Sequence, residues 1–217
     1  MKKLLYLTIC AAGILGVTPQ LTAQQSEQAR VDQATRIAER FLAMPENGIP
    51  PRVLRNAKGV AIISVVKGGL LWSGRVGDGV VVARTPQGWS GPSFIHIAGA
   101  GFGPQIGANV TDYVIMLNTP EAVRAFSRGV NVQLGGNLSA AAGPVGRTAE
   151  FGALPFADVY TYSRSRGLFA GVALEGTTIS TNRIANERYY HGPVSAGAIL
   201  SARVRPPQGA ARLRHVF

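Results

Sequence analysis

The chain has 217 residues, of which 22 are Lys or Arg and 11 are Asp or Glu, so its formal net charge is +11 at pH 7. Hydrophobic residues make up 46% of the chain and charged residues 15%, a balance that excludes an intrinsically disordered protein. The length suits one domain with a sizeable core. The 27 glycines indicate many turns and bent strands, and the single Cys excludes an intramolecular disulfide.

The first 23 residues have the pattern of an export signal. Lys2 and Lys3 precede an apolar run over 4–17, and Ala23 supplies a small residue before a cleavage point. The run is shorter than the ~20 apolar residues of a membrane span, which favours a cleaved signal peptide over an uncleaved anchor. We therefore expect an exported protein of the periplasm or cell envelope, peripheral to the membrane.

Residues 24–44 are predicted to form an amphipathic helix that ends before Pro45. Its apolar positions fall on one arc and include Ile37, Phe41 and Leu42, with charged residues opposite. One interpretation is a helix packed on the core of the domain. The other is a helix lying in a membrane interface, with Ile37, Phe41 and Leu42 in contact with acyl chains.

From residue 50 onward the pattern changes to strands. Runs rich in apolar residues at 59–66, 79–84, 94–98, 113–117, 158–163 and 168–174 predict strands, as does the alternation over 130–138. Short helices are predicted after the cap Thr119, over 182–190 and over 194–201. The fold class is thus α+β: a strongly bent, Gly-rich sheet or barrel over 50–201, with an N-terminal amphipathic helix and two or three short helices.

The residues that carry chemistry are sparse. The three His are far apart in sequence and no HExxH pair occurs, so neither a metal site nor a cofactor is expected. Ser93, His96 and Asp112 supply the residue types of a hydrolase, but no G-x-S-x-G elbow accompanies them. A Ser hydrolase is therefore the least favoured function.

The basic excess points to an anionic partner, and most of the basic residues are Arg, whose planar fork suits phosphate. Nucleic acid is not expected, because an exported protein seldom meets it and no stacking motif is present. Anionic phospholipid fits better, although the same charges also keep a domain soluble. Residues 202–217 are basic and favour a solvated tail, with a lipid-touching arm as the alternative.

Several segments in fixed order resemble the SYLF-domain family. The resemblance covers about residues 30–201, most of the mature chain, and its segments are IPPRVLRNAKGVAI at 49–62, KGGL at 67–70, WSGPS at 89–93, GAGFGPQIG at 99–107, FSRG at 126–129, LGGNLS at 134–139, AGPVGR at 142–147 and YSRSRGLFAG at 162–171. The resemblance implies a non-enzymatic SYLF-like domain over 24–201 that binds phospholipid. Eukaryotic members prefer phosphoinositides, and some fungal members bind and bundle actin.

The leading hypothesis is therefore a module that binds anionic phospholipid, such as phosphatidylglycerol or cardiolipin, at the bacterial cell envelope. The residues expected to hold lipid phosphate are Lys58, Lys67, Arg75, Arg147, Arg164 and Arg166. The attraction would come from charge, at ~1 kcal/mol per basic residue near an anionic surface, and from burial of the helix. The alternative is a protein-interaction or scaffolding module, which predicts an exposed apolar patch.

Overall fold

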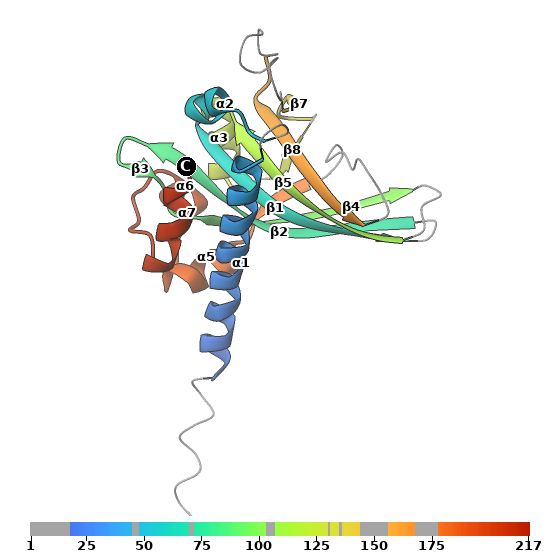
Figure 1. Ribbon diagram of the computed structural model, residues 1–217. Coiled ribbons are helices and arrows are strands. Elements are labelled where there is room, and N and C mark those ends of the chain that lie inside the picture. Colours follow the sequence, from blue (N-terminus) through green and yellow to red (C-terminus); the bar gives the residue numbers. More distant parts are fainter. Residues whose placement is uncertain are drawn as a thin grey trace, which may run out of the picture.

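The computed structural model describes residues 18–44, 48–69, 72–102, 107–129, 131–134, 136–143, 156–167 and 178–217. Within them the protein is α+β, as the sequence predicts: a strongly curled sheet carries helices on both faces (Figure 1). The long strands are β1 (Gly59–Gly69), β2 (Trp72–Thr85), β4 (Ser93–Phe102), β5 (Gly107–Leu117) and β8 (Val159–Gly167).

The sheet has the order β6-β9-β4-β2-β1-β5-β8-β7. Its outer members are β6 (Val132–Gln133), β9 (Thr178–Thr181) and β7 (Ala140–Ala142), and β3 (Gly88–Trp89) pairs with the end of β2. Central strand β1 pairs antiparallel with β2 and with β5 over its whole length. β7 pairs parallel with β8. The register fixes which side chains share a face, because neighbouring residues of a strand point to opposite faces.

Each face of the sheet carries its own hydrophobic core. On one face, Val60 and Ile62 of β1 pack with α1 (Thr18–Leu42), α2 (Pro51–Asn56), α5 (Arg183–Tyr190) and α7 (Ala211–His215). On the other face, Ala61 and Ile63 pack with α3 (Pro120–Ser127) and α6 (Ala196–Leu200). The continuous apolar run of β1 follows from this two-sided burial.

Helix α1 is packed on the sheet along the apolar arc seen in the sequence. Val31, Ala34, Ile37, Ala38 and Phe41 are all buried. The helix begins at Thr18, earlier than predicted, and ends at Leu42, two residues sooner. The interpretation of a helix packed on the core therefore describes this structure.

Two of the short helices begin at side-chain caps, of which the sequence predicts Thr119. Thr119 Oγ1 accepts a hydrogen bond from Ala122 N at the start of α3, and Asn182 Oδ1 accepts one from Ala185 N at the start of α5. His191 ends α5 in the left-handed conformation, with φ 60°. The predicted cap at Thr119 is confirmed, because a cap is satisfied by residues within its own first turn.

Two predictions of local structure are wrong. Residues 130–138 do not form one strand, because β6 ends at Gln133 and Leu134 bridges to Leu138 after a turn. The C-terminal segment is no solvated tail: η1 (Gln208–Ala210) and α7 pack on α1, and Leu213 is fully buried. The strand predicted over 168–174 lies outside the described residues.

Candidate functional site

Helix α1 crosses the sheet and is tied to it by two ion pairs. Arg30 Nη1 lies 3.7 Å from Asp78 Oδ1 on β2, and Arg40 Nη2 lies 3.2 Å from Asp112 Oδ2 on β5. Asp78 and Asp112 both stand opposite Ser64 of β1, so they belong to one row across the sheet. Ten helical residues thus carry α1 from β2 across β1 to β5.

Asp112 is a buried carboxylate beneath α1. Only 1% of it is exposed, and it accepts hydrogen bonds from Arg40 at 3.2 Å and from Ser64 Oγ at 2.9 Å. Arg164 stands opposite Asp112 on β8, with its side chain exposed. A buried charge of this kind is stable only when it is paired, so Asp112 fixes the position of Arg40 and with it the C-terminal half of α1.

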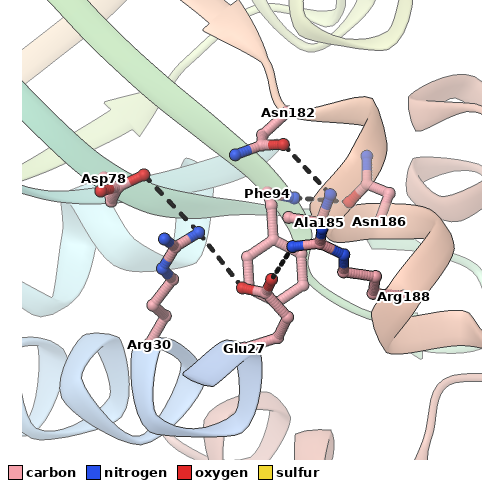
Figure 2. Close-up of polar contacts among 8 residues, drawn as sticks. All are labelled: Glu27, Arg30, Asp78, Phe94, Asn182, Ala185, Asn186 and Arg188. Atoms are coloured by element: carbon pink, nitrogen blue, oxygen red, sulfur yellow. Dashed lines mark hydrogen bonds and ion pairs between the residues drawn. The ribbon is translucent and has the colours of Figure 1, made fainter. Parts of the chain in front are cut away.

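A second ion cluster holds the N-terminal half of α1. Figure 2 shows Arg30 of α1 and Arg188 of α5 converging on the buried carboxylate of Glu27, at 3.1 and 3.9 Å. Beside it, Asn186 of α5 accepts a hydrogen bond from Phe94 N at 2.7 Å and so ties α5 to β4. This cluster joins three elements, and its placement indicates a structural role.

A cavity of about 590 Å³ lies where α1 ends against β8. Phe41, Met44 and Tyr162 supply its apolar lining, and Arg164 supplies a cation. Burial raises the pKa of Tyr162 far above its ordinary value, and neighbouring Tyr160 adds to the effect, so the Tyr162 hydroxyl is neutral at physiological pH. A cavity of this size suits part of a small amphiphile.

Beyond α1 the same face of the sheet is open to solvent. Two residues along each strand from the row of Asp78, Ser64 and Asp112 stands a row formed by Val76, Val66 and Val110. Val76 is 63% exposed and Val66 is 47% exposed, although both residues lie on middle strands of the sheet. In Figure 1 the strands β1, β2 and β5 run on past α1, with no helix of the described chain over them.

The structure separates the residues predicted to hold lipid phosphate. Lys67 and Arg75 stand opposite each other on β1 and β2. Lys58 precedes β1, about 30 Å of extended chain from Lys67. By register, Arg164 belongs to the face that carries α1, whereas Lys67 and Arg75 belong to the other face, and Arg166 stands opposite Val110 along the strand pair β5 and β8. Arg147 lies outside the described residues.

Several of the described arginines outside the predicted phosphate-binding set are paired with carboxylates. The pairs include Arg30 with Glu27, Arg40 with Asp112, Arg183 with Glu187 and Arg212 with Glu39. The structure does bring Arg164 to the cavity that Phe41 also lines. A phosphate-binding role for the six residues stays a prediction.

The residues expected to touch acyl chains lie against the domain in this structure. Ile37 is 1% exposed and Phe41 is 3% exposed, while Leu42 packs partly buried against the same core. Their contact with a membrane stays a prediction, and it requires α1 to leave the sheet.

The geometry does not assemble a hydrolase site from Ser93, His96 and Asp112. Ser93 and His96 lie three residues apart on β4 and point to opposite faces. Asp112 lies on β5, three strands from β4, or about 14 Å. Ser93 Oγ accepts a hydrogen bond from Asn186 Nδ2 at 3.2 Å instead.

Within the described ranges, no three His, Cys, Asp or Glu side chains gather closely enough to hold a metal ion. In the same part of the chain, no helix has the length and hydropathy needed to cross a membrane.

Sequence reasoning missed the open valine row. The apolar run ending at Val66 predicts a wholly buried strand, yet β1 continues to Gly69 and α1 leaves its far end uncovered. Val76 lies in the polar stretch Arg75–Asp78, before the predicted start of its strand at 79. No local pattern marks this stretch as a strand, because Val76 is the only apolar side chain between Arg75 and Asp78.

Comparison with known proteins places the chain among proteins named for binding. A family model described as "Ysc84: Las17-binding protein actin regulator" matches residues 98–217. The chain is 44% identical over 200 residues to LAS seventeen-binding protein 3 of Saccharomyces cerevisiae (strain ATCC 204508 / S288c), covering 90% of this chain and 44% of that protein. It is 49% identical over 174 residues to Protein YSC84 of the same strain, covering 78% of this chain and 37% of that protein.

A human relative extends the comparison beyond yeast. The chain is 46% identical over 176 residues to SH3 domain-containing YSC84-like protein 1 of Homo sapiens, covering 80% of this chain and 52% of that protein. The chain therefore spans about half or less of the length of these relatives. No solved structure is significantly similar to it.

Proposed function

The chain belongs to the Ysc84 family, and on that premise we propose that it is a non-catalytic module that binds a protein partner of the actin-regulating kind. The observation that supports this function is the exposed pair of Val66 and Val76 on an uncovered sheet face. Exposed apolar side chains gathered beside a domain core are typical of interaction surfaces. The relatives are named for the proteins that they bind or for an SH3 domain that accompanies this one.

The test is direct binding of the purified chain to actin filaments and to Las17. We expect it to sediment with filaments or to be retained by immobilised Las17, in a saturable manner. Chain denatured and left unfolded serves as the control for non-specific adsorption. Failure to bind either protein at any salt concentration would overturn the proposal.

Anionic phospholipid is a second candidate ligand, and the cavity at the end of α1 favours it. Phe41, Met44 and Tyr162 line this cavity beside the exposed Arg164. An acyl segment would bury against the first three while its phosphate pairs with Arg164. Each basic residue near an anionic surface contributes about 1 kcal/mol, so this site gives weak, salt-sensitive binding.

Vesicle flotation separates this second candidate from the first. We expect recovery with phosphatidylglycerol vesicles at low salt, release at high salt and little recovery with phosphatidylcholine. Arg164→Glu should weaken recovery several-fold, whereas Arg183→Glu makes the same charge change on exposed α5 and should match the unaltered chain. Equal recovery with both lipids would count against the site.

We further propose export of the chain with cleavage after Ala23. The cleavage point falls in α1, whose described buried contacts begin at Glu27. Removal of residues 1–23 therefore spares those contacts. N-terminal sequencing of the chain recovered from the periplasm of an expressing bacterium should give Gln24 first, and recovery of only uncleaved chain would contradict the proposal.

A further inference from the structure

We propose that the open face beside α1 binds an acidic amphipathic helix of the partner. The site is the row formed by Val66, Val76 and Val110, here called the valine ledge. This inference rests on the proposed protein-binding function and names the chemistry of the segment that the partner presents.

The floor of the valine ledge is apolar and open. Val66 stands directly opposite both Val76 and Val110, so the three side chains form a continuous row on the face that carries α1. Gly74 lies opposite Gly68 in the next row outward, and a Cβ added at Gly74 would meet nothing within 4 Å. An approaching element therefore reaches the valines without steric hindrance.

The dimensions suit a short helix. From β4 to β8 the sheet spans four strand spacings, or about 19 Å. A helix of about 13 residues covers that distance. Helix α1 already crosses these strands on the adjoining row, from Arg30 at β2 to Arg40 at β5. A partner helix laid on the valine ledge would extend the same layer of helices over the sheet.

The charges beside the valine ledge favour an acidic partner. Arg36 is exposed on the flank of α1, and Arg40, 41% exposed, lies next to it around a shared hollow. Arg164 stands exposed at the β8 end. The carboxylates nearby are already engaged: Asp112 is buried against Arg40, Asp78 pairs with Arg30, and Glu39 pairs with Arg212. The surplus is cationic, so Glu and Asp on the outer face of a bound helix would be attracted.

Two synthetic peptides of about 13 residues test the charge requirement. Both carry Leu at helical spacing on one face, and the remaining positions are Glu in one peptide and Lys in the other. We expect fluorescence anisotropy with the full chain to show the Glu peptide binding at least about tenfold more tightly, a difference of about 1.4 kcal/mol. Equal affinities, or no measurable binding of the Glu peptide, would overturn the proposal.

Paired variants test the location. Val76→Asp should weaken binding of the Glu peptide at least about tenfold, because it places an unpaired negative charge under the helix. Ile184→Asp makes the same kind of change at a 56% exposed position of α5 and should have no effect. Arg36→Glu should weaken binding of the Glu peptide, whereas Arg183→Glu should leave it unchanged. Circular dichroism verifies that each variant is folded.

The outcomes distinguish this proposal from the function on which it rests. If the chain binds actin or Las17 and Val76→Asp leaves both that binding and peptide binding unchanged, the valine ledge is not the site and the function stands. If the Glu peptide binds at the valine ledge but neither protein binds the chain, the proposed function falls and the inferred helix chemistry remains.

Discussion

Gly79 lies in the centre of the sheet, where its missing side chain makes room for the backbone of β1. A Cβ at this position would meet the carbonyl oxygen of Ile62, whereas one at Gly74, on the same strand, would meet open space. These two glycines of β2 therefore differ in how much an added methyl group would destabilise the fold. We expect Gly79→Ala to lower the free energy of unfolding by about 2 kcal/mol or more.

Gly74→Ala is the matched control for this change. It should alter the free energy of unfolding by no more than about 0.5 kcal/mol. Urea denaturation of both variants provides the measurement. Equal destabilisation would show that the strand itself, and not the contact with Ile62, excludes a side chain.

Tyr113 makes the stability of the fold sensitive to alkali. Burial raises the pKa of its hydroxyl from 10.0 to about 12, against smaller opposing effects of Arg75 and Thr111. The folded state therefore holds a proton that the unfolded state releases, so this contribution is complete below pH 10 and is lost as the pH rises to about 12. The free energy of unfolding should fall over that interval.

Tyrosinate absorbance measures the same group directly. The folded chain should show a titration near pH 12 that Tyr113→Phe removes, and the variant should lose less stability between pH 10 and 12. An unchanged titration curve in the variant would contradict the assignment.

At the scale of elements, α7 is part of the fold and is anchored by one side chain. Leu213 is fully buried against the core that α1 shares. Leu213→Ala should lower the free energy of unfolding by about 2–5 kcal/mol. Arg212, its neighbour, forms an exposed pair with Glu39 at 2.9 Å, so Arg212→Ala should cost less than about 1 kcal/mol. Thermal denaturation compares the two, and a larger cost for Arg212→Ala would be contrary to this view.

The elements that the sequence predicts best are those with local causes. Thr119 and Asn182 cap α3 and α5, and apolar spacing identifies α1, all within a few residues. Strand ends are predicted poorly, because residues 72–78 of β2 are rich in Gly and polar residues. These residues become a strand only through pairing with β1 and β4. The basic sequence of α7 does not show that one side of the helix is buried. That side packs on α1, which is distant in the chain, so no local pattern predicts the contact.

For the whole molecule, the question is whether α1 stays docked or leaves the sheet. The ion pairs at Glu27 and Asp112 hold it at two places, and its apolar arc forms part of a continuous core. We expect backbone amides over 31–41 to exchange hydrogen with nearly the protection of β1, because α1 opens only when that core does. Much faster exchange in α1, with β1 still protected, would reveal a helix that detaches alone and would favour membrane contact.

The candidate site is less predictable than the fold. The sequence indicates arginines suited to anions, but their partners are set by strand order, which brings Asp112 to Arg40 from 72 residues away. Of the predicted residues, the structure unites Phe41 and Arg164 at one cavity and separates Lys67 and Arg75 from them by the thickness of the sheet. The SYLF resemblance implies relatives that bind actin, and the matching family model is described as an actin regulator. The valine ledge depends on where α1 stops covering the sheet, which no local pattern encodes.

Arg212 and Glu39 are 173 positions apart in the chain, yet they join α7 to α1. During synthesis, α1 leaves the ribosome long before the segment that completes its covering exists. Its apolar arc, which includes Ile37 and Phe41, packs on β1, β2, β5 and α5 as well as on α7, so its burial is complete only after α7 has been made. A chaperone or bilayer that meets the nascent chain can therefore contact this arc before the completed domain buries it.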